Sequence, residues 1–191
     1  MNIAVFVSGN GTNLQAIINA VKKGVIKAKI ALVVSNKKDA YALTRAKNEC
    51  IETFVLDHKK FSSREKYDKE IIKELEKRNI NLITLAGFMR LLSPYFIKKY
   101  QGKIMNIHPS LLPVFKGTHG IRDAFEAGVK KTGVTVHFVD EELDHGPIIM
   151  QKEVSVEKTD TLETLEEKIH KVEHELYPQA IKSVVNGKTK F

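Results

Sequence analysis

The strongest constraint on the fold is an alternation of short apolar runs with longer amphipathic segments, which begins at the start of the chain. Apolar runs at 3–7 and 30–34 flank a segment of helical period at 12–23. Parallel strands must be joined by a crossover of a dozen or more residues, usually a helix, and this segment has that length. The pattern therefore predicts a strand–helix–strand unit of a parallel sheet covered by helices.

The alternation continues along the rest of the first hundred residues. Further helices are expected at 40–48 and 63–77, and further buried strands at 53–56, 82–86 and 103–107. Ser62 and Glu65 have the spacing of a capping box for the helix at 63–77.

The character of the chain changes after Gly133. Runs at 134–139 and 148–156 are rich in β-branched residues, and they are joined through the turn sequence Asp144-His145-Gly146-Pro147. This arrangement predicts an antiparallel pair added to the sheet. We expect an α/β fold with a Rossmann-like, mostly parallel twisted sheet flanked by helices and an antiparallel extension in its C-terminal part.

A last helix is expected to begin near Thr161, with Asp160 and Glu163 as its cap, and to end at Asn186-Gly187. Pro178 is expected to kink or interrupt it, because proline cannot donate a backbone hydrogen bond. Repeats and linkers are not evident, and a length of 191 residues favours one domain.

Charge and apolar patterning narrow the classes of function. Lys and Arg outnumber Asp and Glu by 31 to 23, which suits anionic ligands. A basic stripe with interleaved aromatic residues is absent, so nucleic acid is not the expected partner.

The first apolar run is too short for a signal peptide and no run approaches the roughly 20 residues of a membrane helix, which predicts a cytoplasmic protein. Cys50 is the only cysteine, expected to be a small buried residue and unable to form an internal disulfide.

The first candidate site is the segment Ser8-Gly9-Asn10-Gly11-Thr12-Asn13, between a predicted strand and a predicted helix. Backbone N–H groups and the helix dipole favour a bound phosphate there, and Thr12 and Asn13 add side-chain donors. The segment is similar to the start of a dinucleotide fingerprint, but Leu14 replaces the third glycine, which favours a single phosphate. The alternative is a tight turn without a ligand.

The second candidate is Asn106-Ile107-His108-Pro109-Ser110-Leu111-Leu112-Pro113, at the end of a predicted strand. Residues two apart in an extended chain share a face, so Asn106 and His108 project together. An amide beside an imidazole at the carboxyl edge of a sheet can polarise a carbonyl group and hold an oxyanion. The alternative is a strand-end pair bonded to the backbone.

The third candidate is Asp144. A carboxylate close to His108 would favour the protonated imidazole, although Asp before Gly-Pro also suits an ordinary turn.

The other histidines each have two interpretations. His137 is expected either to form hydrogen bonds in the core or to act in catalysis. His119 is expected either to contact the substrate or to begin a helix. His170 and Glu173 share one face of the last helix, where they would bind a sugar or face solvent. The histidines lack a paired metal-binding spacing, so no metal is expected.

Taken together, four segments resemble the glycinamide ribonucleotide formyltransferase family in order and spacing along essentially the whole chain: Ser8 to Asn13, Leu85-Ala86-Gly87-Phe88-Met89-Arg90, Asn106 to Pro113, and Leu143-Asp144-His145-Gly146-Pro147. The resemblance implies transfer of a formyl group from the co-substrate 10-formyltetrahydrofolate to the amine of a ribonucleotide, without a metal. It also implies one domain over 1–191, with a phosphate-binding part at about 1–100 and a catalytic and folate-binding part at about 101–191. His145 departs from the pattern as a titratable residue in the variable place of Asp-x-Gly.

The resemblance implies a role for each site residue. Asn106, His108 and Asp144 form the catalytic set. The phosphate and ribose of the ribonucleotide are held by Gly11, Thr12, Asn13, His170 and Glu173. The folate is surrounded by Arg64, Met89, Arg90, Leu91, Leu92, Asn106, Asp140, Glu141, Glu142, Leu143 and Asp144. The expected partners are these small molecules, with no nucleic acid or membrane, and the protein is expected to be a monomer or homodimer.

Other functions remain as alternatives. Formyltetrahydrofolate deformylase is similar around the same three catalytic residues, but its relatives usually carry an amino-terminal regulatory domain and a His where Pro109 stands. Methionyl-tRNA formyltransferase shares the catalytic segment but needs a further domain to bind tRNA. A non-catalytic, basic nucleotide-binding module would leave the three residues without a purpose.

Overall fold

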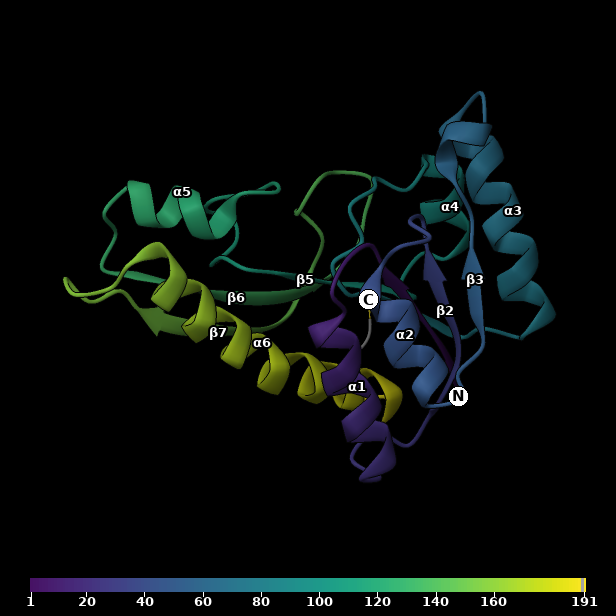
Figure 1. Ribbon diagram of the computed structural model, residues 1–191, viewed down its shortest axis with the longest axis horizontal. Helices are drawn as coiled ribbons and strands as arrows, with labels where there is room; N and C mark the ends of the chain where they lie inside the picture. Colours follow the sequence, from purple (N-terminus) through teal and green to yellow (C-terminus); the bar gives the residue numbers. More distant parts are fainter. Residues whose placement is uncertain (190) are drawn as a thin grey trace.

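The computed structural model, which describes residues 1–189 and 191, contains one sheet in the strand order β3-β2-β1-β4-β5-β6-β7 (Figure 1). Strands β1 to β5 are parallel, and β6 and β7 are antiparallel additions at one edge. The expected fold class is therefore confirmed. The strand bounds are β1 Asn2–Val7, β2 Lys29–Ser35, β3 Thr53–Val55, β4 Leu82–Leu85, β5 Ile104–His108, β6 Lys131–Phe138 and β7 Ile148–Ser155.

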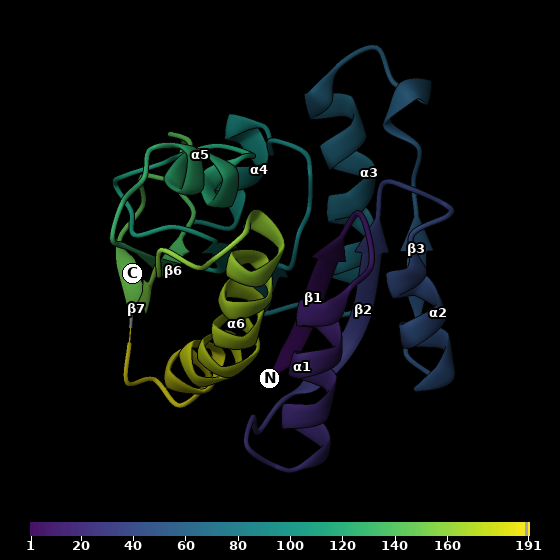
Figure 2. The same cartoon turned by 60° about the vertical axis from the view of Figure 1, so that its left-hand side comes forward.

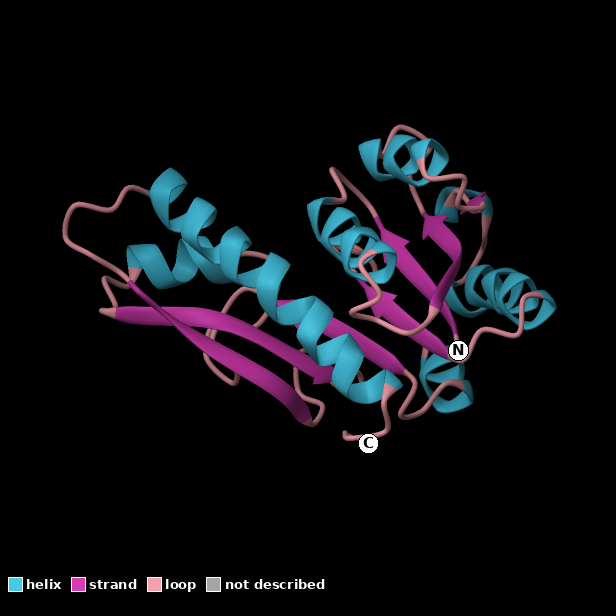
Figure 3. Ribbon diagram, turned by 90° about the horizontal axis from the view of Figure 1, so that it is seen from below, coloured by secondary structure: helices cyan, strands magenta, loops and turns pink. Residues whose placement is uncertain are grey.

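Helices cover both faces of the sheet, as Figures 2 and 3 show. Buried side chains of α1, α2 and α6 pack on one face, and those of α3 and α4 pack on the other. Short helix α5 lies beside α6. The bounds are α1 Thr12–Lys22, α2 Tyr41–Asn48, the 3₁₀ turn η1 His58–Lys60, α3 Arg64–Lys77, α4 Pro94–Lys99, α5 Gly120–Glu126 and α6 Leu162–Val185.

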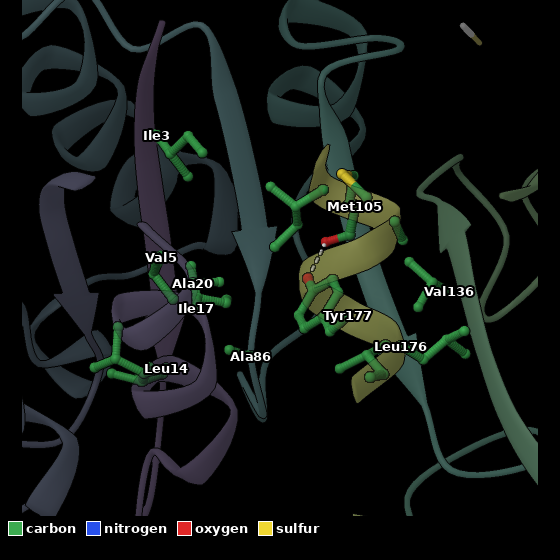
Figure 4. Packing of buried hydrophobic residues seen from close by; sticks show 14 of the residues in the cluster. Ile3, Val5, Leu14, Ile17, Ala20, Ala86, Met105, Val136, Leu176 and Tyr177 are labelled. Atoms are coloured by element: carbon green, nitrogen blue, oxygen red, sulfur yellow. Dashed lines mark hydrogen bonds between the residues drawn. The ribbon is translucent and has the colours of Figure 1, made fainter. Parts of the chain in front are cut away.

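Strand β1 shows why two hydrophobic cores form. Its side chains alternate between the faces of the sheet, so Ile3 and Val5 belong to the core under α1 and α6, while Phe6 belongs to the core under α3 and α4. On the first face, the hydroxyl of Tyr177 in α6 donates hydrogen bonds to the carbonyl oxygens of Leu85 and Met105. Figure 4 shows the bond to Met105. The fully buried tyrosine thus fastens α6 to the central strands β4 and β5.

Several local expectations are wrong. The cap of α3 is Ser63, whose hydroxyl accepts the Lys66 amide, rather than Ser62. The cap of α6 is Thr161, which forms a capping box with Thr164 in place of Asp160 with Glu163.

Three further features differ from expectation. Helix α6 runs through Pro178 without interruption, because the core contacts of its flanking residues hold the helical backbone on both sides. Cys50 is exposed, since it lies just beyond α2 in a turn with φ +53°. Helix α4 was not expected, although Ser93-Pro94 is a typical helix start and Phe96 is fully buried.

The strand order reverses beside β1, since β2 lies on one side of it and β4 on the other. Open α/β sheets bind ligands beyond the carboxyl ends of the strands at such a reversal. The loops after β1, β4 and β5 leave this edge, so the fold itself selects the place for a site. Within the residues that the structure describes, no helix has the length and apolar character to cross a membrane.

Candidate functional site

The loop after β1 is shaped by Gly11. Its φ is +75°, and a side-chain carbon there would lie 2.5 Å from the Cβ atom of Ala42. Within residues 1–189 and 191, no side chain caps the following helix α1, so its first N–H groups have no side-chain acceptor there. This is the uncapped, positively polarised helix start that suits a phosphate group.

The buried Asn13 connects this loop to α6. Its side-chain amide donates to Glu173 Oε2 at 3.1 Å, and Nδ1 of His170 lies 2.9 Å from the same oxygen. The side-chain oxygen, Asn13 Oδ1, is buried without a hydrogen-bond partner among the residues that the structure describes. The bond to Glu173 raises the pKa of His170 against the opposing effect of burial. The structure therefore brings the expected phosphate-binding and sugar-binding residues together.

Arg45 is a contributor to this site that sequence reasoning missed. From α2, its guanidinium donates to the Asn10 carbonyl and to Asn10 Oδ1, both at 2.9 Å, and to Gln15 at 3.3 Å. It braces the phosphate loop and places a positive charge beside it. An arginine on an exposed helix has no distinguishing sequence pattern, so only the tertiary contact identifies it.

The buried Ser8 links the phosphate loop to the loop after β4. Its hydroxyl donates to Asn36 Oδ1 at 2.6 Å and accepts the backbone N–H of Met89 at 2.8 Å. The segment that contains Met89 is thereby fixed to the end of β1.

The loop between β6 and β7 brings Asp144 to the end of β5. Asp144 Oδ2 lies 3.5 Å from Nδ1 of His108, and Oδ1 lies 3.5 Å from the side-chain nitrogen of Asn106. Asp144 adopts φ +48° and is only 8 % exposed, and His108 is 4 % exposed. An amide, an imidazole and a carboxylate thus meet in one buried place, as the expected catalytic set requires.

The segment after Pro113 covers this cluster. The Phe115 carbonyl lies 2.8 Å from Nε2 of His108, and the Gly117 amide donates to Asp144 Oδ2 at 2.8 Å. Both ring nitrogens of His108 therefore face an oxygen atom. This segment also leads to His119, which precedes α5 and contacts Thr118 rather than the cluster.

His137 on β6 completes the polar cluster. Its Nδ1 lies 2.7 Å from the Phe138 carbonyl, and its Nε2 lies 3.2 Å from the Asn106 amide and 3.7 Å from Asp144. Burial acts to raise the pKa of Asp144, but the contact with His137, the bond from Gly117 and the nearby His108 together lower it. The carboxylate form is therefore the stable form of Asp144 in the cluster.

The residues expected around the folate lie at the start of α3, in the loop after β4, on β5 and in the loop between β6 and β7. Arg64 is exposed at the first turn of α3, and Arg90 lies 4.9 Å from the Tyr67 ring centroid. Met89, Leu91 and Leu143 expose large apolar side chains, whereas Leu92 is buried in the core. Asp140 accepts the Glu142 amide and contacts His145 at 2.9 Å, and Glu141 is exposed. Exposed apolar side chains beside a polar cluster suit a flat, partly apolar ligand.

Among the residues that the structure describes, no cluster of three or more histidine, cysteine or carboxylate side chains is arranged to hold a metal ion. The described site instead combines the glycine loop after β1, where a phosphate is expected, with the polar cluster of Asn106, His108 and Asp144 at the end of β5. Strand β4 is the single strand between them. This layout suits group transfer to or from a phosphorylated molecule.

Comparison with known proteins identifies close relatives. Residues 1–181 match the family model described as formyl transferase. The chain is 46 % identical over 191 residues to phosphoribosylglycinamide formyltransferase of Escherichia coli, which covers all of this chain and 90 % of that protein. It is 50 % identical over 187 residues to the chicken trifunctional purine biosynthetic protein adenosine-3, which covers 98 % of this chain but only 19 % of that protein.

A solved structure agrees with these relatives. The crystal structure of phosphoribosylglycinamide formyltransferase from Bacillus halodurans superposes with a TM-score of 0.96 and is 45 % identical. The match covers 99 % of this chain and 97 % of the other.

Proposed function

The chain belongs to the formyl transferase family, and from this premise we propose that it transfers the formyl group of 10-formyltetrahydrofolate to the amine of phosphoribosylglycinamide in purine biosynthesis. The observation that carries the proposal is the approach of Asp144 to both His108 and Asn106, at the sheet edge that also bears the phosphate loop. The proposed partners are these two small molecules, without nucleic acid or a metal. The protein would act in the cytoplasm as a monomer or homodimer.

The proposed binding sites follow the layout of the loops. Gly11, Thr12 and Asn13 hold the ribonucleotide phosphate, and His170 and Glu173 hold its ribose. The hydrogen bonds that join Asn13, Glu173 and His170 support a single continuous site. We assign the binding of the folate to Arg64, the segment from Met89 to Leu92, Asn106 and the loop from Asp140 to Asp144.

In the proposed reaction, the amine nitrogen attacks the formyl carbon directly, and the formyl oxygen becomes an oxyanion. N–H groups of His108 and Asn106 donate to that oxygen. The carbon–nitrogen bond to folate then breaks, N10 of the folate gains a proton and the attacking nitrogen loses one. No covalent enzyme intermediate is needed.

Asp144 is assigned two tasks in this reaction. Its carboxylate, which the cluster keeps ionised, favours the protonated form of His108. It also accepts and returns the proton that moves from the amine to N10. The Phe115 carbonyl lies beside Nε2 of His108, at the position that the formyl oxygen of the substrate would take in this mechanism. Substrate binding therefore requires residues 115–117 to move.

The deciding experiment mixes the protein with 10-formyltetrahydrofolate in the presence and absence of phosphoribosylglycinamide and follows tetrahydrofolate release. Release that requires the ribonucleotide, with formylated ribonucleotide formed in equal amount, is the expected result. Equal release without the ribonucleotide would identify a deformylase instead. Binding of nucleic acid with a steep salt dependence and no release at all would favour a non-catalytic module.

A further inference from the structure

The loop between β6 and β7 carries a side chain that the proposed reaction does not use. His145 directly follows Asp144, but the two side chains have different surroundings. That of Asp144 is 7 % exposed within the polar cluster, whereas that of His145 is 54 % exposed. Nδ1 of His145 lies 2.9 Å from Asp140 Oδ2, within hydrogen-bonding distance. This contact joins the start of the loop to the residue that follows the proposed catalytic carboxylate.

The Asp140 carboxylate holds the loop at two points. Its Oδ1 accepts the backbone N–H of Glu142 at 3.1 Å, and its Oδ2 faces the imidazole of His145. Glu142 Oε2 lies 3.9 Å from the same ring nitrogen, so two carboxylates face this imidazole. In the described part of the chain, neither carboxylate forms a salt bridge with a lysine or an arginine. His145 is thus the basic partner that the Asp140 side chain has there.

The base of the loop is fixed by its backbone. The Phe138 amide donates to the Pro147 carbonyl at 2.9 Å. A side-chain carbon on Gly146 would collide with the Phe138 carbonyl oxygen and would lie 3.3 Å from the Asp140 nitrogen, so the two ends of the loop lie against each other. The contact between His145 and Asp140 adds a second closure above this base.

The backbone of Asp144 needs such a closure. Its φ is +48°, in the left-handed region, which costs a residue other than glycine conformational energy. In this conformation its Oδ2 lies 3.5 Å from Nδ1 of His108 and accepts the Gly117 amide at 2.8 Å. A hydrogen bond on the next residue opposes relaxation of this backbone, because one peptide group joins Asp144 to His145.

We propose that His145 is a positioning residue for formyl transfer: its hydrogen bond to Asp140 holds the loop in the path that places Asp144 against His108. This inference rests on the proposed function, which gives Asp144 its part in the reaction. The imidazole acts through Asp140 and touches neither substrate. Without the bond, the same catalytic side chains are present, but the carboxylate of Asp144 is held less firmly.

The kinetic test is His145→Ala. The pair is partly exposed, and contacts of this kind change an equilibrium about two- to fivefold, so we expect kcat to fall by a factor in that range. The KM for phosphoribosylglycinamide should stay unchanged, because its proposed site lies on the loop after β1 and on α6. The effect of a weakly held Asp144 thus falls on the chemical step.

Two further variants separate the hydrogen bond from a general loss of side chain or charge. His145→Asn keeps an N–H donor close to the position of Nδ1 and should restore most of kcat. Lys152→Ala is the matched control on β7. It removes a partly exposed ion pair of the same 2.9 Å length, between Lys152 and Glu175, and should leave kcat unchanged.

A second measurement needs neither substrate nor turnover. The Gly117 amide donates to Asp144 Oδ2, so its hydrogen exchange, followed by NMR in the ligand-free protein, reports how firmly the carboxylate is held. We expect this exchange to accelerate about two- to fivefold in His145→Ala. In His145→Asn and Lys152→Ala it should match that of the unmodified protein.

Three results would overturn the inference: an unchanged kcat in His145→Ala, a reduced kcat that His145→Asn does not restore, or a reduced kcat with unchanged exchange of the Gly117 amide. A rise in the KM for 10-formyltetrahydrofolate at unchanged kcat belongs to the first of these and would show instead that the imidazole contacts the folate. Failure of the proposed function gives a different result, because the unmodified protein would then form no formylated ribonucleotide, while the Gly117 amide would still respond to His145→Ala.

Discussion

Nε2 of His108 lies 2.8 Å from the Phe115 carbonyl oxygen, while its other ring nitrogen faces Asp144. The imidazole is thus oriented from both sides before any substrate arrives. A carbonyl oxygen already occupies the position proposed for the oxyanion, so in the proposed mechanism the substrate would displace one backbone acceptor from a ring that is already oriented.

The first prediction concerns this pair. His108→Ala and Asp144→Asn should each lower kcat on the order of a hundred- to a thousandfold, because each removes or weakens an oxyanion donor. The dissociation constant for phosphoribosylglycinamide, measured by calorimetry, should change little, since neither residue is assigned to the phosphate or ribose. His119→Ala is the matched control, because the one side-chain hydrogen bond of His119 among the described residues joins it to Thr118. Near-normal turnover in both test variants would refute the assigned mechanism.

The second prediction concerns the phosphate loop. Gly11→Ala forces a side chain into a left-handed backbone and against Ala42, so kcat/KM for the ribonucleotide should fall on the order of a hundredfold. The free energy of unfolding of this variant should also be lower by about 1–2 kcal/mol. Gly9→Ala is the control, because a side-chain carbon there meets no atom within 4 Å. Equal losses in the two variants would show that backbone geometry at Gly11 is unimportant.

The third prediction is a pH dependence. The pKa of His170 is raised from 6.5 by its bond to Glu173, so the protonated imidazole is favoured in the folded state. Its contribution to stability should be fully present below about pH 6.5 and lost as the pH rises through the higher folded pKa. The unfolding free energies of the protein and of His170→Gln should therefore converge at alkaline pH.

An internal comparison is available one turn along α6. Burial lowers the pKa of His174, so NMR titration should find the two imidazoles displaced in opposite directions. In Glu173→Gln the titration of His170 should return toward 6.5. A His170 midpoint unaffected by that substitution would contradict the assigned cause.

The fourth prediction concerns stability. Tyr177→Phe leaves the buried carbonyl groups of Leu85 and Met105 without this donor and should cost about 1–3 kcal/mol in chemical denaturation. Tyr67→Phe is the matched control, because the Tyr67 hydroxyl is buried without a hydrogen-bond partner in the described part of the chain, and its removal should cost little. A larger loss at Tyr67 than at Tyr177 would be inconsistent with the hydrogen bonds described.

The regular part of the fold follows from local patterns in the sequence. Strand β1 is a continuous apolar run of strand length and α1 has a clear helical period, and both lie close to where they were expected, as do the antiparallel strands β6 and β7. The caps of α3 and α6 were misplaced because neighbouring Ser62 and Ser63, or Asp160 and Thr161, are all good capping residues. The backbone path that enters each helix decides which of the two side chains accepts the hydrogen bond from the first turn of the helix.

The expected site residues could be named from the sequence, but the contacts among them could not. Asn106 and His108 share a strand, so their common direction follows from the sequence. The contact with Asp144 depends on a loop that starts one strand later, and the bracing by Arg45 depends on how α2 packs beside the phosphate loop. Such long-range contacts leave no local pattern that a single sequence can display.

The hydroxyl of Ser8 ties together the two backbone segments that border the proposed sites of the reactants. It joins the end of β1 to the Met89 amide, and these backbone segments border the proposed sites of the acceptor and the donor. The separation between the two proposed sites is therefore set by a covalent and hydrogen-bonded span of the protein, and not by the flexibility of either ligand. Two molecules that meet in dilute solution only by chance would be held there at a fixed spacing, which would remove most of the entropy loss from the chemical step.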